Sequence, residues 1–153
     1  MITKEDARKV VSEELESLRQ RIIENHLRAG QKASGRTIAS LHVETDNDGG
    51  ILFGRKAFGT LETGRRGGKV PKGFYHIIYQ WMQDKGIQVE RPKSFAYLVA
   101  RKIAREGTKL YRQGGRDDIY SNEIPKTTES VLSRITGLLG ASVESINLNS
   151  KKE

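Results

Sequence analysis

Hydrophobic positions recur at helical spacing between Thr3 and Gly30. Seven apolar residues lie three or four positions apart among mostly charged neighbours and form one stripe: Ala7, Val10, Val11, Leu15, Leu18, Ile22 and Ile23. Thr3 is placed to cap this helix, Glu5 and Asp6 suit its first turn because they face the positive end of the helix dipole, and Gly30 is placed to end it. The pattern predicts a long amphipathic helix packed on its own domain; the alternative is a partner-facing arm.

A different period follows the break at Ser34-Gly35. Arg36 to Ser40 is expected to form one or two helical turns, and apolar and polar residues then alternate from Leu41 to Asp46, as in a half-buried strand. Asn47 to Gly50 have turn chemistry because Asn, Asp and Gly tolerate positive φ, and Ile51 to Arg55 returns as a second strand. The pattern predicts a β-hairpin.

Beyond a short helical segment expected at Phe58–Thr63, a second amphipathic helix is predicted after Pro71. Its apolar residues follow the spacing i, i+3, i+4, i+7 and i+8: Phe74, Ile77, Ile78, Trp81 and Met82. Gly86 is placed to close it, with Ile87 folding back on Met82 in a Schellman contact. Trp81 lies centrally in the stripe and is interpreted as a core residue, whereas Tyr75 and Tyr79 either complete the core or are interface aromatics.

Two further helices complete the pattern. After a turn at 91–93, Ser94 is placed to cap a third helix that ends at Gly107 and carries Phe95, Leu98, Val99 and Ile103. The polar segment Thr108–Ser121 is expected to be a long loop. A fourth helix is predicted from near Pro125 to Gly140, followed by a last strand at Ser145–Asn149 and a frayed tail at 150–153; its stripe is Val131, Leu132, Ile135, Leu138 and Leu139.

Composition narrows the class of protein. The length of 153 residues suits a single domain, 1–153, and the absence of Cys excludes a disulfide scaffold and any Cys-based zinc or redox site. No apolar run approaches the ~20 residues of a membrane span, and Met1–Gln20 lacks the apolar core of a signal peptide, so secretion by that route is not expected. Hydrophobic residues make up 35%, which indicates a modest core.

The charge indicates an anionic partner. Lys and Arg number 27 against 19 Asp and Glu, a net charge of +8 that suits nucleic acid, an acidic protein surface, or simply a basic surface with no dedicated partner. The glycine-rich loop Gly64–Lys72 concentrates cations, although Val70 after Lys69 breaks the pattern of a nucleotide-binding loop. The loop can contact phosphates, order against an acidic protein, or remain solvated; its cations are Arg65, Arg66, Lys69 and Lys72.

No catalytic or metal-binding constellation emerges. Glu44, Asp46, Asp48 and Gly49 imitate the start of a calcium loop, but Arg55 stands where its final Glu is needed, and a hairpin turn explains both glycines. The remaining candidates are also better explained as surface side chains: the histidines His26, His42 and His76, the acidic pair Asp117-Asp118, and the cations Arg101, Lys102 and Arg105, which the helix dipole stabilises. This favours a binding or structural role.

Three segments read in order resemble a known family. They are Gly59–Arg65 (GTLETGR), the run from Pro71-Lys72-Gly73-Phe74 through Trp81 to Lys85-Gly86-Ile87, and Phe95–Thr108 (FAYLVARKIAREGT). Their order and spacing are similar to those of the tail-completion, or neck, proteins of tailed bacteriophages, the head–tail joining family of the HK97 type. The resemblance covers roughly residues 30–140, and the segment after Gly107 departs from the commoner pattern because its loop is longer.

The resemblance implies a fold and a role. The fold is α+β, with amphipathic helices packed on a short antiparallel sheet and a long flexible loop. The role is a non-enzymatic virion protein without cofactors, assembled in the host cytoplasm as a six- or twelve-fold ring that joins the head-side portal or adaptor connector to the tail tube or hub. The family's assembly loop corresponds to Gly64, Arg65, Arg66, Gly67, Gly68, Lys69 and Val70.

Two hypotheses from different classes therefore stand beside each other. The first is a neck-ring subunit with protein partners above and below it. The second is a basic protein that binds nucleic acid without sequence preference, with the loop cations and Lys72, Arg101 and Arg105 as candidate anion contacts. In the first case the same cations face either an acidic neighbour or genomic DNA in the ring lumen. A nuclease is a third, weaker alternative.

Overall fold

The chain folds into an elongated α+β molecule, mostly helical, with a two-stranded antiparallel sheet packed on its first helix. The structure is a computed structural model that describes residues 1–150, with side chains to residue 144, so the tail predicted at 150–153 lies, beyond Ser150, outside the described residues. The elements are α1 (Lys4–Arg28), α2 (Arg36–Ser40), β1 (His42–Thr45), β2 (Gly50–Phe53), η1 (Lys56–Gly59), α3 (Thr60–Thr63), α4 (Phe74–Asp84), α5 (Pro92–Glu106), α6 (Lys109–Arg112) and α7 (Glu123–Ser150).

Helix α1 begins and ends where the sequence predicts. The Thr3 hydroxyl accepts from the backbone N–H of Asp6 at 3.1 Å and the Asp6 carboxylate accepts from the backbone N–H of Thr3 at 2.8 Å, which completes a capping box. At the other end Ala29 is the C-cap and Gly30 follows with a φ of 68°.

The predicted hairpin is confirmed and covers the apolar side of α1. His42 pairs with Phe53 and Thr45 with Gly50, while the Asp46 carboxylate accepts from the backbone N–H groups of the turn. A Cβ at Gly50 would lie 2.7 Å from a methyl carbon of Leu15 and 3.0 Å from one of Val11, so a larger residue there would have to displace side chains of α1. The short helical turns expected at Arg36–Ser40 and Phe58–Thr63 are present as α2, η1 and α3.

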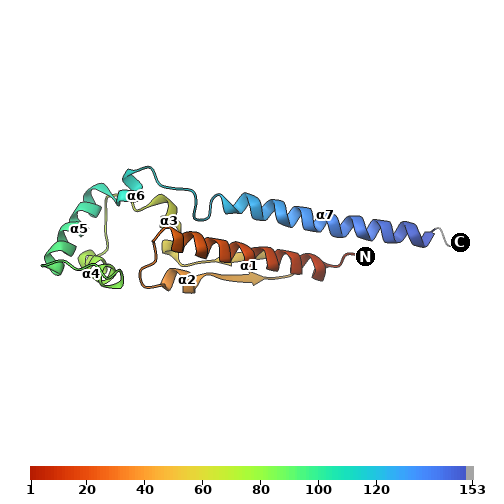
Figure 1. Cartoon of the computed structure of the whole chain (residues 1–153), viewed down its shortest axis with the longest axis horizontal. Helices are drawn as coiled ribbons and strands as arrows, with labels where there is room; N and C mark the ends of the chain where they lie inside the picture. The colour runs from red at the N-terminus through yellow and green to blue at the C-terminus, as the bar shows by residue number, and fades with distance from the viewer. Residues whose placement is uncertain (151–153) are drawn as a thin grey trace.

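Helices α4 and α5 form a helical hairpin at the end of the molecule opposite the chain termini (Figure 1). The Schellman motif predicted after α4 is present, because the Ile87 N–H donates to the Met82 carbonyl at 2.9 Å and the Gly86 N–H donates to Gln83 at 3.0 Å. The start predicted for α5 is wrong: the helix begins at Pro92, whose missing N–H and fixed φ suit a first helical position, and Ser94 lies inside it.

Helix α7 is longer than predicted. It begins at Glu123 and continues past Gly137 and Gly140 to Ser150, so the expected stop at Gly140 and the expected strand at Ser145–Asn149 are both wrong. Neither glycine has a positive φ, and a glycine that keeps right-handed geometry weakens a helix without ending it. The expected loop at 108–121 is also interrupted, by the single helical turn α6, which the Thr108 side chain caps.

The apolar core of the described residues is split into two small clusters. One lies between α1, the hairpin and the segment before α7 and contains Leu18, Ile22, Leu41 and Ile119; the other lies between α4 and α5 and contains Ile78, Met82, Ala96 and Ala100. The prediction that Trp81 is a core residue is wrong, since 42% of it is exposed. Phe95 and Leu98 are exposed as well, because the two alanines, which admit a closer helix–helix approach, form the buried face of α5.

Candidate assembly surfaces

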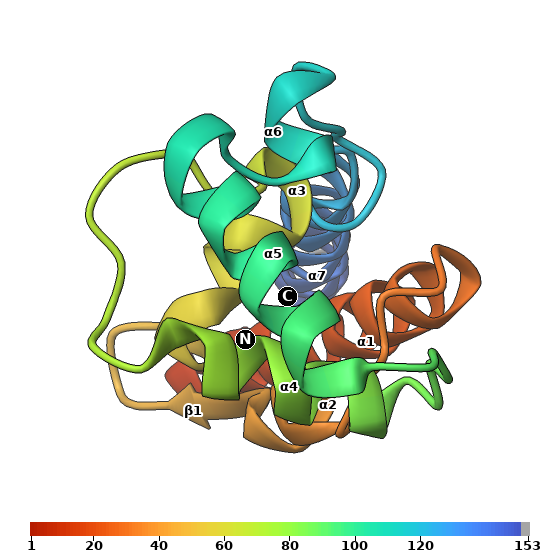
Figure 2. The same ribbon diagram turned by 90° about the vertical axis from the view of Figure 1, so that its left-hand side faces the viewer.

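The first half of the glycine-rich loop is fixed against the C-terminal end of α5. The Gly68 N–H donates to the Ala104 carbonyl at 2.6 Å, the Thr108 N–H donates to the Arg65 carbonyl at 2.9 Å, and the Arg65 N–H donates to the Thr108 hydroxyl at 3.0 Å. A Cβ at Gly107 would lie 2.7 Å from the Arg65 carbonyl oxygen. The predicted assembly loop, Gly64–Val70, is therefore anchored at its base, and Figure 2 shows the rest of the 64–73 connection running out as an arc beside α4 and α5.

Arg65 contributes to this anchor rather than to the open surface. Its guanidinium lies 5.0 Å above the Phe74 ring and donates to the Lys69 carbonyl at 3.1 Å, so it links the two ends of the arc. Its Nε is buried and has no hydrogen-bond partner among the described residues. Arg66 and Lys69 are exposed and remain available to a partner.

The three candidate anion contacts outside the loop are all exposed. Lys72 and Arg101 present their charge at the surface, with the Arg101 guanidinium 6.0 Å from the Tyr97 ring. Arg105 forms an ion pair with its neighbour Glu106 at 2.7 Å. Because the Gly68 N–H is hydrogen-bonded to the Ala104 carbonyl, the loop cations and the α5 cations lie at the same end of the molecule.

The basic charge is concentrated in this end of the chain. Residues 64–113, here called the basic lobe, contain twelve Lys or Arg and three Asp or Glu, a net charge of +9. The other residues contain fifteen Lys or Arg and sixteen Asp or Glu, a net charge of −1. The net charge of +8 is thus distributed very unevenly over the chain. Such a distribution favours one kind of partner at the basic lobe and another at the rest of the molecule.

An apolar groove of about 550 Å³ opens on the basic lobe between α4, α5 and α6. Half-exposed side chains from α4 and partly buried ones from α5 and α6 line it: Ile77, Trp81, Val99, Ile103 and Leu110. Lys102, Lys109 and Arg112 also line it, and because the surface is almost wholly apolar they contribute mainly their methylene stems. A groove with an apolar floor and cationic ends suits an apolar segment that carries negative charge.

A second uncovered apolar surface runs along α7. Leu132, Leu139 and Val143 lie at helical spacing and are 66%, 47% and 57% exposed. Among the described side chains of α7 only Glu123 and Thr127 are buried. We call Leu132, Leu139 and Val143 the α7 stripe.

Polar contacts hold α7 against α1. Arg134 bonds to Glu14 at 2.9 Å and to Glu13 at 2.5 Å near the middle of α1, and Arg21 bonds to Glu123 at 2.8 Å and to Thr127 at 2.7 Å nearer its end. These contacts occupy one face of α7 and leave the α7 stripe outside the core.

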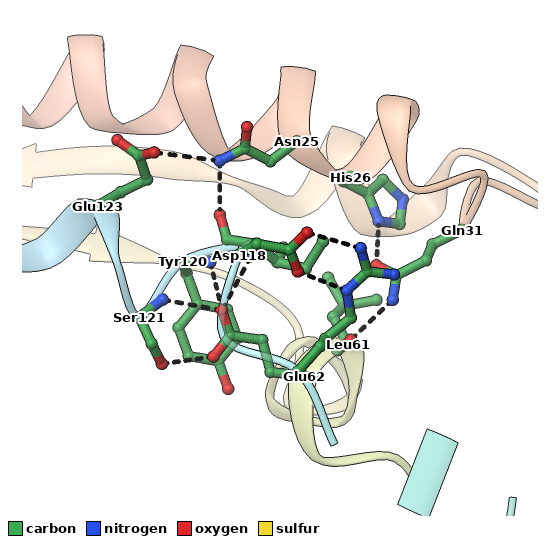
Figure 3. Close-up of polar contacts among 11 residues, drawn as sticks. Asn25, His26, Gln31, Leu61, Glu62, Asp118, Tyr120, Ser121 and Glu123 are labelled. Atoms are coloured by element: carbon green, nitrogen blue, oxygen red, sulfur yellow. Dashed lines mark hydrogen bonds and ion pairs between the residues drawn. The ribbon is translucent and has the colours of Figure 1, made fainter. Parts of the chain in front are cut away.

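A buried polar junction joins the body of the molecule to the start of α7. Glu62 is 97% buried, and its carboxylate accepts from three successive backbone N–H groups, those of Ile119, Tyr120 and Ser121, at 3.0, 2.6 and 2.8 Å, as well as from the Ser121 hydroxyl. Figure 3 shows the Glu62 side chain pointing at Tyr120 and Ser121, with Asn25 reaching from α1 toward Glu123. The junction fixes where α7 starts relative to α3.

Ionisable groups at the junction and at the contact between α1 and α7 have shifted pKa values. Burial alone would raise the pKa of Glu123, but hydrogen bonds from Arg21, Asn25 and Lys126 outweigh burial and lower it. Burial, with a contribution from the charge of Glu62, raises the pKa of Tyr120, whose hydroxyl donates to the Gly59 carbonyl at 3.1 Å. Hydrogen bonds from Arg134 lower the pKa of both Glu13 and Glu14. All of these shifts have structural causes within the fold.

Sequence reasoning missed the junction and both uncovered apolar surfaces. Glu62 lies in the segment Gly59–Arg65, but nothing in the sequence pattern shows that its hydrogen-bond partners lie 57 to 59 residues further on. A signal for the groove was present, since a stripe of five apolar residues in α4 is wider than α5 can cover with alanines.

Comparisons and chemistry add few constraints. No protein-family model, curated protein or solved structure matches the chain. Within the described residues, no group of three or more His, Asp or Glu side chains is placed to hold a metal ion. None of the helices over residues 1–150 combines the length and apolarity needed to cross a membrane.

Proposed function

We propose that this protein is a non-enzymatic structural subunit that assembles with copies of itself into a ring at the neck of a tailed bacteriophage, joining the head-side connector to the tail. Self-assembly, the first part of this proposal, is supported by the large exposed surface of the chain. The position at the phage neck draws on the resemblance of Gly59–Arg65, the α4 region and Phe95–Thr108 to tail-completion proteins.

The observation that carries self-assembly is the excess of surface. The chain exposes 10958 Å² for a mass of 17.2 kDa, whereas a compact monomer of that mass exposes about 7,800 Å². Two interfaces of ordinary size remove about 1,600 Å² from each subunit. The excess therefore accommodates a neighbour on each side, as a subunit in a ring requires.

Disruption of the gene in the phage that encodes the chain tests the proposal. Loss of a neck subunit leaves DNA-filled heads and finished tails that do not join, and supplying the protein in trans restores joined particles. Electron microscopy of the lysate distinguishes these outcomes. Particles with tails firmly attached, produced without the protein, would contradict the proposed role.

A second function, nucleic-acid binding without sequence preference, is favoured by one observation, the net charge of +9 confined to the basic lobe. Exposed Arg66, Lys69, Lys72 and Arg101 gather there. Such a protein binds duplex DNA with an affinity that falls steeply as the salt concentration rises. Replacing all four of these residues with Gln should reduce both the affinity and the steepness of its salt dependence. Weak DNA binding that changes little with salt would contradict this function and favour an acidic protein as the partner of these cations.

A further inference from the structure

We infer that the α7 stripe of one copy docks in the apolar groove on the basic lobe of the next, so that the subunits associate head to tail. The inference deepens the proposed ring and rests on its self-association. It names the two surfaces that meet and excludes the symmetric alternative in which like surfaces meet.

The two surfaces complement each other in chemistry. The groove is lined by Ile77, Trp81, Val99, Ile103 and Leu110, and the side chains that the structure describes leave it open. The α7 stripe is an exposed apolar row on a helix held to α1 at Glu123, Thr127 and Arg134. A helix laid in a groove by apolar side chains at positions i, i+7 and i+11 is a common way for such surfaces to meet.

Charge selects the pairing. Between Ile135 and Ser150 the only charged residue is Glu144, next to Val143 in the stripe, and three cations line the groove: Lys102, Lys109 and Arg112. Two grooves facing each other would bring together two lobes of net charge +9 each. Like charges at an interface are costly, so the basic lobe favours the nearly neutral end of α7 over a second basic lobe.

Geometry then favours a closed assembly of many copies. The groove lies at the α4–α5 end and α7 extends toward the other end of the long axis (Figure 1). A contact between different surfaces leaves one of each free on every pair, so addition continues until the copies close into a ring or extend as a filament. A symmetric contact would stop at two copies.

The absence of cysteine from the chain makes a direct test possible. The variants Lys109→Cys, in the groove lining, and Val143→Cys, in the α7 stripe, each carry a single thiol. They are mixed and treated with a short bismaleimide. Ser133→Cys, at an exposed position about 100° round α7 from Leu132, replaces Val143→Cys as the matched control. Light scattering reports the mass of every sample before cross-linking.

The inference predicts covalent dimers in the mixture of Lys109→Cys with Val143→Cys, at least several-fold above either variant alone and above the Ser133→Cys mixture. Dimers formed equally by one variant alone overturn it in favour of a symmetric contact, such as stripe on stripe. An assembled sample with no selective cross-link overturns the interface and leaves the ring standing. A sample that is monomeric throughout overturns both.

A second variant pair tests the interface without cross-linking. Leu139→Lys combined with Val143→Lys places cations opposite the basic lobe, on an exposed face where folding does not depend on these side chains. We expect at least a ten-fold weaker association, with unchanged circular dichroism. Ser133→Lys combined with Ala141→Lys adds the same charge at exposed positions outside the stripe and should retain the wild-type association. Equal effects from the two pairs would overturn the inference.

Discussion

At the scale of single residues, the molecule depends on a few buried polar contacts that join distant parts of the chain. Glu62 is the clearest, because one carboxylate satisfies three backbone donors and a hydroxyl in the turn before α7. Such donors are costly to bury without a partner. A glutamate in a short helical segment thus ties α3 to the turn before α7.

Replacing Glu62 tests this role. Glu62→Ala leaves the N–H groups of Ile119, Tyr120 and Ser121 without their acceptor and should lower the free energy of unfolding by about 3 kcal/mol, whereas Glu62→Gln keeps one oxygen and should cost about 1 kcal/mol. Chemical denaturation followed by circular dichroism measures both. Asp117→Asn, at an exposed position of the same segment, should change stability by less than about 0.5 kcal/mol. Equal losses for Ala and Gln would contradict the account.

Glu123 makes the stability of the same region depend on pH. Its folded pKa is lowered, so the stability that it contributes is complete above its ordinary pKa of about 4.3 and is lost as the pH falls through the folded value. Glu123→Gln should cost about 1–2 kcal/mol at pH 7. The variant should also lose less further stability than wild type between pH 7 and pH 3. Denaturant titrations at the two pH values measure the difference, and Glu129→Gln should behave as wild type.

At the scale of elements, the sequence predicted what is local and missed what depends on distant neighbours. The caps at Thr3 and Gly30, the hairpin and the Schellman motif at Gly86 follow from residues a few positions apart, and all are present. Gly140 has the same composition signal as Gly86 but does not end its helix. The difference is the backbone conformation of the glycine, which is left-handed at Gly86 and right-handed at Gly140, and which the residue type alone does not determine.

The burial of apolar side chains was likewise predictable where it depends on local sequence and not where it depends on distant neighbours. The helical period of α4 and α5 was predicted correctly, but which of their apolar residues face each other was not. Ala96 and Ala100 bring α5 close to Ile78 and Met82, and this leaves Trp81 and Leu98 outside. Only the packing partner identifies the buried face when a helix has apolar residues on more than one side.

The anchor of the glycine-rich loop gives a prediction at this scale. In Gly107→Ala the new Cβ would meet the Arg65 carbonyl, and the left-handed backbone is strained for alanine, so we expect a loss of about 2–4 kcal/mol and release of the loop from α5. Gly114→Ala has a similar φ with nothing within 4 Å and should cost about 1 kcal/mol. Trypsin cleavage at Arg65 and Arg66 under native conditions should accelerate only in Gly107→Ala.

At the scale of the whole molecule, the apolar core is small and split, and the exposed surface is correspondingly large. Nine buried apolar side chains among the described residues, two of them alanines, form a modest core for a chain of 153 residues. Subunits of this kind gain stability from their neighbours, since association buries surface that the monomer leaves exposed. In the proposed ring, the basic lobe determines which surface of the neighbour is met.

Salt should weaken the assembly. Head-to-tail contact brings Glu144 of one copy close to Lys102, Lys109 and Arg112 of the next, and this attraction is screened as the Debye length falls from ~10 Å at 0.1 M toward 3 Å at 1 M. Sedimentation at 0.1 and 0.5 M sodium chloride should therefore show a larger dissociation constant at the higher salt. A symmetric contact between basic lobes would show the opposite trend, because salt would relieve their repulsion.

Native mass spectrometry of the purified protein tests the central claim most directly. A ring subunit gives one dominant species whose mass is a fixed multiple of 17.2 kDa, six or twelve copies in the proposed neck ring. A single species at 17.2 kDa, or an open ladder of masses with no preferred copy number, would contradict the claim that the uncovered surfaces of this chain close it into a ring.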